Sequence, residues 1–248
     1  GFLTVLGPSP NDQHTTCLAG RQCVLGDPAF SGQGLSGSDR VALLLVSAGG
    51  ACGTGARDLA VAHGETKAIA ADGGSLVARL APETWRAAAL QRGDTWTVCY
   101  CVRNYGGCDA DTEYTALVGR VTVYGPSPLG QDATCVANAG CTVPHSSSAV
   151  VGVGLSVADR IALVRWGGYC GFSARDAAVS SGSASALLAQ GPGLQAALAA
   201  ADLPIGGRWL LCYCVGAAPS DGCAADGDFA AQLGVLSVWG PAPNRQAL

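Results

Sequence analysis

The segment WTVCYC, residues 96–101, returns as WLLCYC at residues 209–214, and it decides the fold of this chain. Aromatic and β-branched residues are typical of strands, and a strand places alternate side chains on opposite faces. We expect the face with the two cysteines to be the outer one, because it also carries threonines, and the aromatic face to belong to the core. The outer face then holds Thr95, Thr97, Cys99 and Cys101, and the core face holds Trp96, Val98 and Tyr100.

Outward from this strand, the chain consists of two copies of one pattern, over residues 7–123 and 125–238. Each copy has a short cysteine loop (CLAGRQC, then CVANAGC), a GLS segment (GLSGSDRVALLLV, then GLSVADRIALVRW) and a CG segment (ACGTGARDLAV, then YCGFSARDAAV). A closing phrase occurs three times, as GFLTVLGPSP at 1–10, GRVTVYGPSP at 119–128 and GVLSVWGPAP at 234–243. Three phrases around two bodies indicate a tandem array of repeats.

The pattern predicts an all-β chain of two tandem, disulfide-bonded immunoglobulin-like β-sandwich domains. VALLLV and IALV are continuous apolar runs, which favours buried strands, and LTVLG ends at Gly-Pro as a strand entering a turn does. We assign residues 1–6 to a closing-type strand of a preceding repeat or a donor strand, residues 7–124 to the first sandwich and residues 125–248 to the second. At most one short helix is expected in each domain, at residues 82–91 and 194–203.

The twelve cysteines recur in register, which indicates a disulfide framework and an extracellular, oxidising compartment. The alternative is zinc held by thiolates, but the chain has no paired C-x-x-C knuckles and no histidine recurs between the copies. Short loops favour bridges between cysteines that are close in the sequence. The cysteine that follows the buried strand, Cys52 or Cys170, then remains to pair with a cysteine of the CYC strand. The predicted bridges are Cys17–Cys23, Cys52–Cys99, Cys101–Cys108, Cys135–Cys141, Cys170–Cys212 and Cys214–Cys223, with the assignments of Cys99 and Cys101 open to exchange. No metal and no cofactor is expected.

Composition and motifs argue against several classes of function. The net charge is −4 and Lys67 is the only lysine, so no basic stripe is available for nucleic acid. The apolar runs are too short to span a bilayer. GLSGS at 34–38 does not match the G-x-S-x-G nucleophile elbow, and its copy reads GLSVA. We therefore expect no nucleic-acid partner, no membrane insertion and no enzymatic activity. Because the sequence starts without Met, we expect it to be processed or an excerpt.

Acidic residues that recur between the copies are the remaining candidates for a polar site. They are Asp39 and its copy Asp159, and Asp58 and its copy Asp176. They could bind Ca²⁺ or stabilise a transition state, but no D-x-D-x-D-G loop is present. We interpret Asp39 and Asp159 as turn residues before strands, and we expect Arg57 and Arg175 to form ion pairs.

Both copies carry the same order of motifs: GP-x-P, C-x5-C, GLS-x-x-D, CG, W-x-x-CYC and a closing V-x-GP. This order resembles tandem cysteine-rich repeats of large surface or flagellar-hair (mastigoneme-type) proteins of algae and alveolate protists. The resemblance covers almost the whole chain, and CYC and V-x-GP are its most specific parts. It implies immunoglobulin-like modules arrayed in an extracellular fibre, flagellar hair or cell-surface array, with copies of the chain or adjacent repeats as partners.

The alternative function is an adhesin or lectin-like module that binds glycans through variable loops such as residues 62–74 or 180–193. Trp85, Trp166 and Tyr169 could form a sugar-binding platform. Because they do not recur at equivalent positions, we interpret them as core or interface residues.

Two further expectations concern assembly and modification. An apolar strand with unpaired backbone groups tends to join another sheet edge, so we predict that the first closing strand is paired in a sheet and that Trp239 marks the equivalent strand of the second domain. That assembly strand consists of Phe2, Leu3, Thr4, Val5 and Leu6. No N-x-[ST] sequon is present, so N-glycans should be absent. O-linked sugars are predicted at Pro8, Pro10, Pro126, Pro128, Ser146, Ser147 and Ser148.

Overall fold

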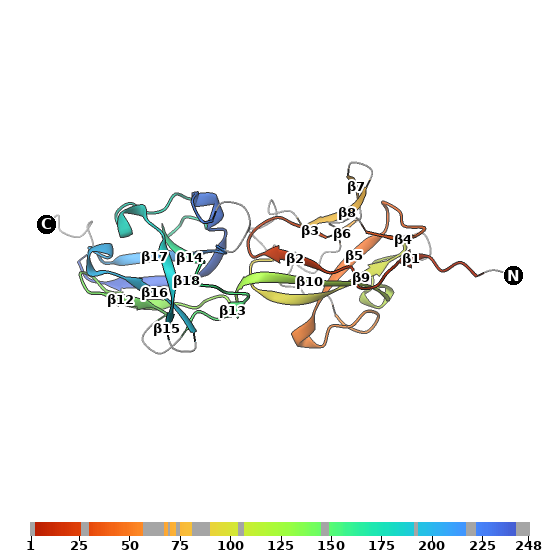
Figure 1. The fold of residues 1–248 in the computed structure, drawn as a ribbon, viewed down its shortest axis with the longest axis horizontal. Helices are drawn as coiled ribbons and strands as arrows, with labels where there is room; N and C mark the ends of the chain where they lie inside the picture. The colour runs from red at the N-terminus through yellow and green to blue at the C-terminus, as the bar shows by residue number, and fades with distance from the viewer. Residues whose placement is uncertain are drawn as a thin grey trace. The chain divides into compact units, whose positions relative to one another are not determined.

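The computed structural model describes residues 3–25, 30–56, 67–68, 70–72, 75–80, 90–103, 107–144, 149–190, 193–216 and 222–241. The chain forms two compact units (Figure 1). The first comprises Gly1–Leu90 and Asp94–Val123, and the second comprises Gln91–Gly93 and Tyr124–Leu248. The division after Val123 lies one residue from the boundary that the repeats predict.

The second unit is a disulfide-bonded, immunoglobulin-like β-sandwich. Its first layer has the strand order β11-β18-β17-β14, and β11 runs parallel to β18 while the other pairs are antiparallel. These strands are β11 (Ala133–Val136), β14 (Arg160–Arg165), β17 (Gly207–Cys214) and β18 (Ala231–Trp239).

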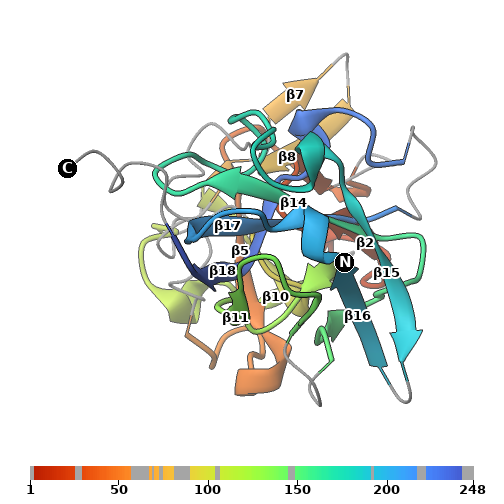
Figure 2. The same cartoon turned by 90° about the vertical axis from the view of Figure 1, so that its left-hand side faces the viewer.

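The second layer of this unit contains the hairpin of β15 (Ser185–Gln190) and β16 (Gly193–Leu198), with β12 (Cys141–Val143) beside β16 (Figure 2). The first two residues of β15 pair with β14 and the remaining four pair with β16. Strand β15 therefore joins the two layers.

The first unit repeats this order. One layer contains β10-β9-β5-β6, with β2 on the other side of β10, and the other contains β3-β8-β7. The bounds are β2 (Thr15–Leu18), β3 (Cys23–Leu25), β5 (Arg40–Leu45), β6 (Lys67–Ala68), β7 (Ala70–Asp72), β8 (Ser75–Leu80), β9 (Asp94–Cys101) and β10 (Ala116–Pro126). The last residues of β10 belong to the second unit.

Short elements complete the two units. Two-residue strands are β1 (Gly7–Pro8), β4 (Gly32–Gln33) and β13 (Gly152–Val153). Single 3-10 turns are η1 (Val46–Ala48), η5 (Asp111–Glu113), η6 (Ser180–Gly182), η7 (Ala200–Asp202) and η8 (Asp226–Asp228). Among the described residues, no helix is long and apolar enough to cross a membrane.

Both faces of the central strand β9 are buried, which corrects the predicted outer face. Trp96 and Tyr100 lie in the core as expected, at 0% and 2% exposure, but Cys99 and Cys101 are also buried. The cysteine face packs with Ala42, Leu44, Cys108 and Tyr114, and the second unit has an equivalent cluster around Cys212 and Phe229. Disulfide-linked loops cover this face, so each CYC strand contributes to two apolar clusters.

The helix predicted at residues 194–203 is wrong. Its first half is strand β16, which pairs with both β15 and β12, and its second half contains the 3-10 turn η7. Leu and Ala favour a helix only weakly, and pairing on both sides outweighs that preference. The other predicted helix, at residues 82–91, falls almost entirely outside the described residues.

Candidate functional site

The Gly-Pro phrase forms a turn, and a glutamine that follows the phrase holds this turn through hydrogen bonds to the backbone. Gln131 donates to the carbonyl oxygens of Pro128 and Val151 at 2.9 and 2.8 Å and accepts from the Val151 N–H at 2.8 Å. Gln13 does the same in the first unit, where it bonds Pro10 and Ser31. Sequence analysis missed this residue, although the spacing GP-x-P-x-x-Q occurs three times, ending at Gln13, Gln131 and Gln246.

Backbone groups hold the central phrase from two sides. Gly125 and Pro126 pair with β13 on one side, and the Gly93 N–H donates to the Pro126 carbonyl at 2.8 Å on the other. The approach is so close that a Cβ on Gly152 would lie 2.2 Å from the Gly125 oxygen, and one on Gly93 would lie 2.1 Å from it. Glycine is therefore required at both positions.

Each of the other two phrases shows one of these two sides within the described residues. Gly7 and Pro8 pair with β4, as the central phrase pairs with β13. Pro241 accepts the Gly206 N–H at 2.9 Å, as Pro126 accepts from Gly93. The three phrases thus use one set of backbone contacts, and the central phrase makes both halves of it.

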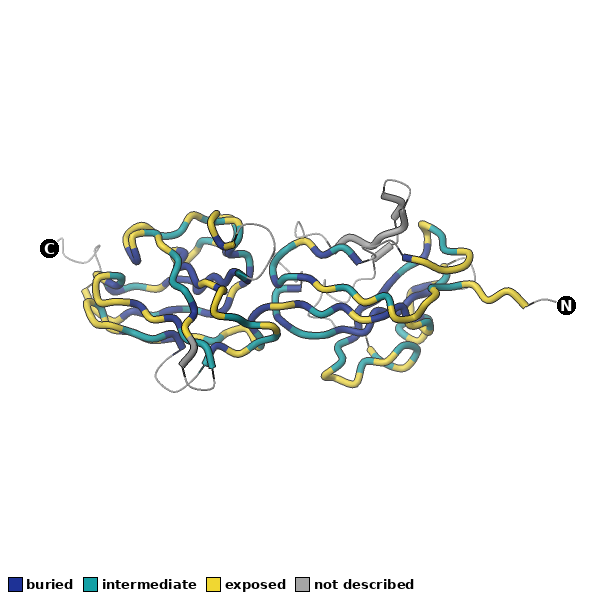
Figure 3. Tube along the Cα trace, viewed as in Figure 1, coloured by how far each residue is buried: buried dark blue, intermediate teal, exposed yellow. Residues whose placement is uncertain are grey.

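The described part of the assembly strand is not paired within this chain, and its pairing with a preceding repeat or a neighbouring molecule stays a prediction. The described part, residues 3–6, forms no strand, and Leu3 and Val5 are 90% and 74% exposed (Figure 3). The equivalent residues of β10 pair with β9. Trp239 does end the closing strand β18 and is 70% exposed.

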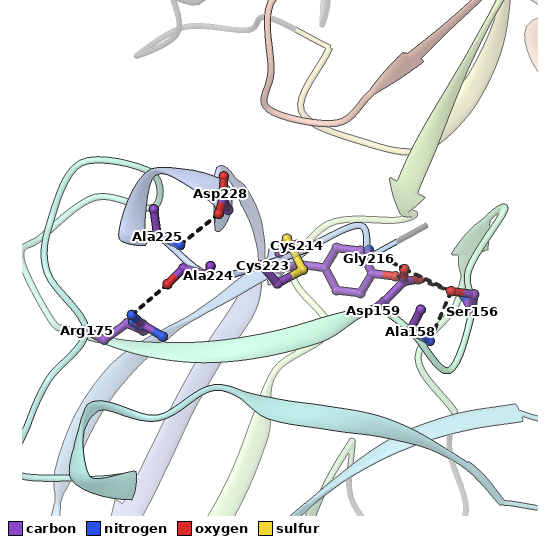
Figure 4. The surroundings of a disulfide bond; sticks show 11 residues. Ser156, Ala158, Asp159, Arg175, Cys214, Gly216, Cys223, Ala224, Ala225 and Asp228 are labelled. Atoms are coloured by element: carbon purple, nitrogen blue, oxygen red, sulfur yellow. Dashed lines mark hydrogen bonds between the residues drawn. A yellow bond between two sulfur atoms is a disulfide. The ribbon is translucent and has the colours of Figure 1, made fainter. Parts of the chain in front are cut away.

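A buried carboxylate and a buried phenol form a second repeated site. Asp159 is 0% exposed and accepts from the Ser156 and Gly216 N–H groups at 2.7 and 2.8 Å and from the Ser156 hydroxyl at 3.1 Å (Figure 4). It also accepts from the Tyr213 hydroxyl. In the first unit, Asp39 accepts from Ser36, Arg103 and Tyr100 in the same way.

This arrangement keeps the phenols protonated. Burial is the main cause that raises the pKa of Tyr213 and of Tyr100 far above the ordinary value, and the hydrogen bond to Asp159 or Asp39 adds to it. Each aspartate serves the turn before its strand, as predicted, and also ties that turn to the CYC strand. The two tyrosines were identified from sequence only as core residues.

All twelve cysteines form disulfides, and the six pairs coincide with those that the spacing predicts, including Cys52–Cys99 and Cys101–Cys108. No thiolate is left for zinc. Among the described residues no group of three His, Cys, Asp or Glu side chains is placed to hold a metal ion.

The remaining predicted site residues are dispersed. Arg175 forms an ion pair with Asp226 at 2.6 Å, and the Asp176 carboxylate accepts the Trp209 indole N–H at 2.9 Å. Pro10 and Pro128 are exposed, whereas Pro126 is buried, which removes it as a glycosylation site. Several other candidate residues fall outside the described residues, namely Phe2, Arg57, Asp58, Trp85, Ser146, Ser147 and Ser148.

Two of the three candidate platform aromatics are on the surface. Trp166 is 50% exposed and Tyr169 is 46% exposed, so these two are not core residues, and the other half of the interpretation, that they are interface residues, stays a prediction. They lie in the segment after β14 that Cys170 anchors to Cys212.

Comparison with known proteins identifies no family. No family model and no curated protein matches the chain. Solved structures with some likeness include the Bacteroides ovatus mixed-linkage glucan utilization locus protein SGBP-B in complex with a mixed-linkage heptasaccharide, at 8% identity and TM-score 0.25 over 96% of this chain and 46% of that chain. Another contains the two tandem V-type regions of VCBP3, a v-region-containing chitin binding protein, at 9% identity and TM-score 0.23 over 94% of this chain and 98% of that chain. Likenesses this weak carry no functional argument.

Proposed function

We propose that this chain is a structural repeat segment of an extracellular fibre, flagellar hair or cell-surface array, of the kind found in mastigoneme-type proteins. The observation that carries the proposal is the repeated Gly-Pro phrase. The phrase is held by backbone N–H and C=O groups and by glycines whose positions leave no room for a side chain. The same turn can therefore recur with little dependence on neighbouring side chains. This is what a tandem array requires.

The disulfides support an extracellular location. Six bridges in one chain suit an oxidising compartment and a mechanically exposed protein, because they restrict the unfolded chain. Each unit has buried apolar residues on both faces of its CYC strand. The phenols with raised pKa values, Tyr100 and Tyr213, are buried and bonded to aspartates that hold the turns. We propose no catalytic activity.

The exposed apolar residues of the first closing phrase are the proposed contact to a neighbouring repeat or copy. Leu3 and Val5 alternate along an extended stretch, and such a stretch adds to a free sheet edge through main-chain hydrogen bonds. The edges available in the second unit are β11 and β12, which end its strand order.

The test measures self-association and native organisation together. Sedimentation of the purified chain across a concentration series should show reversible association that the Leu3→Ser/Val5→Ser variant abolishes. A Val157→Ser variant, which changes another exposed apolar residue, should associate like the parent. Electron microscopy of the native particle should show an array with a repeat of one unit. A chain that stays monomeric, from a source with no ordered array, would overturn the proposal.

A further inference from the structure

The outer face of the first layer in the second unit carries a row of polar and aromatic side chains. The register places Thr134 opposite Ser237 and Ser237 opposite Arg208. The Trp166 N–H donates to the Arg208 carbonyl at 3.2 Å, which extends the row to the end of β14. Thr134, Arg208 and Trp166 are exposed and Ser237 is partly so, whereas the alternate residues Leu236, Val238 and Trp209 point into the core.

A second aromatic ring lies on the same face. Trp239 follows Ser237 by two residues, so it projects to the same side of the sheet, and its cross-strand partner is Val136. Trp239 and Val136 are 70% and 59% exposed. Two strand spacings separate β14 from β18, or about 10 Å. Trp166 therefore ends the row beside Arg208, and Trp239 lies two residues beyond the row, on the strand of Ser237.

Trp166 is held in place. The Arg208 guanidinium lies 4.1 Å from the centre of the Trp166 ring, a cation–π contact that restricts both side chains. Cys170 is joined to Cys212 in β17, which limits the movement of the segment that follows Trp166. The ring is thus presented in a fixed orientation while half of its surface remains in solvent.

The fold does not require these side chains. The equivalent pair in the first unit is Thr122 opposite Thr95, with their hydroxyls 3.5 Å apart. By the repeat alignment, Trp166 corresponds to Val46 and Trp239 to Tyr124. The first unit forms the same sandwich with no arginine and no tryptophan at these positions, so the residues of the second unit serve something other than its core.

We propose that this face, defined by Thr134, Ser237, Arg208, Trp166 and Trp239, binds a glycan chain. A sugar ring offers an apolar C–H face, which stacks on an indole, and a rim of hydroxyls, which bond Ser, Thr and Arg. The face brings both kinds of group together, because Trp166 lies beside Arg208 and Trp239 lies on the same strand and the same side as Ser237. The spacing of the two indoles suits an oligosaccharide rather than a single sugar.

A protein partner fits this face less well. Protein interfaces have an apolar centre depleted in charge and a polar rim. Here the charged Arg208 lies within the row, on β17, between Ser237 on β18 and Trp166 at the end of β14. The glycan site does not depend on the proposed array, because it lies within one unit.

The experiment uses isothermal titration of the full chain with three probes: a neutral β-linked glucose oligosaccharide, a neutral β-linked N-acetylglucosamine oligosaccharide and a sulfated galactan. At least one should bind, and affinity should increase from disaccharide to tetrasaccharide. Trp166→Val and Arg208→Thr introduce the residues of the first unit, so the fold is retained, and each should weaken binding at least tenfold. If the ligand is anionic, Arg208→Thr should abolish binding of the sulfated probe selectively.

The matched control is Leu188→Ser, which removes an exposed apolar side chain from β15 and should leave affinity unchanged. Circular dichroism and thermal unfolding should be the same for all variants. Absence of binding to all three probes overturns the glycan site, and so does binding that survives both substitutions. Self-association lost on Trp166→Val, without any glycan binding, would assign the face to a second copy instead. None of these results depends on the Leu3→Ser/Val5→Ser variant, so the two proposals fail separately.

Discussion

Removing one hydroxyl, in Tyr213→Phe, should measurably destabilise the second unit. The Tyr213 hydroxyl donates to Asp159, and both residues are almost fully buried. Phenylalanine preserves the ring packing, so the loss is confined to one hydrogen bond to a buried carboxylate, which is typically worth about 1.5–3 kcal/mol. Asp159 keeps its other donors, from Ser156 and Gly216, and for that reason we expect about 2 kcal/mol.

The opposite truncation should cost more. Asp159→Ala leaves the Ser156 and Gly216 N–H groups and the Tyr213 hydroxyl without their acceptor. A buried donor that loses its partner costs about 1–3 kcal/mol. Tyr213 is fully buried, whereas Ser156 and Gly216 are partly buried and belong at the low end of that range, so a total of about 3–5 kcal/mol is expected. The difference in the free energy of unfolding between Tyr213→Phe and Asp159→Ala therefore separates the loss of one hydrogen bond from the cost of donors left without an acceptor.

The assay is denaturant unfolding followed by tryptophan fluorescence. Trp209 reports on the second unit and Trp96 on the first, because both are buried. Tyr213→Phe should shift only the second unit's transition, and Tyr100→Phe, the matched change, should shift only the first. A Tyr213→Phe shift below about 0.5 kcal/mol, the usual range for surface changes, would refute the idea that the Asp159 contact stabilises the unit.

The same pair predicts the response to alkali. Burial and the aspartate raise the pKa of Tyr213 and Tyr100 in the folded state, whereas unfolding returns each phenol to about 10. The stability from this source is fully present below pH 10 and decreases as the pH rises above it, because only the unfolded chain then loses the protons. Spectrophotometric titration should show that Tyr213→Phe and Tyr100→Phe each remove one phenol from those that ionise only when the protein unfolds.

Two other predictions concern the Gly-Pro phrase. Gly152→Ala should destabilise the second unit by about 1–3 kcal/mol, because its Cβ would lie 2.2 Å from a backbone oxygen, while Gly140→Ala, whose Cβ meets nothing closer than 3.9 Å, should leave the denaturant midpoint unchanged. Any sugar on the phrase should be at the exposed prolines Pro10 and Pro128; peptide mass mapping that finds only unmodified peptides would contradict the predicted O-glycosylation.

Much of the scaffold could be predicted because the informative signals are local or repeated. The short separations within Cys17–Cys23 and Cys101–Cys108 limit the partners that each cysteine can reach, and the register between copies extends the assignment to the other bridges. The spacing GP-x-P-x-x-Q carries the same kind of signal, because Gln13 and Gln131 each lie three residues after the end of the closing phrase.

Features that depend on tertiary contacts could not be predicted in this way. The segment at 194–203 is compatible with a helix, and only its pairing with β12 and β15 makes its first half a strand. The cysteine face of β9 carries threonines that suggest solvent, but Thr97 donates to the Gly50 carbonyl at 3.1 Å and is buried. Whether a face is outer or inner depends on which loops cover it, and the alternation of one strand does not contain that information.

The distribution of identity and difference between the two units indicates where function resides. Positions that the copies share are those whose contacts admit no alternative: glycines against backbone oxygens, cysteines in bridges and aspartates bonded to phenols. The Cys170–Cys212 bridge constrains one part of the outer face of the first layer. At the row that holds Arg208 and Trp166, the copies diverge from threonine and valine to arginine and tryptophan. Exchanging Val46 for a half-exposed Trp166 places an aromatic ring in water, which supports the proposal that the second unit binds a ligand through this face.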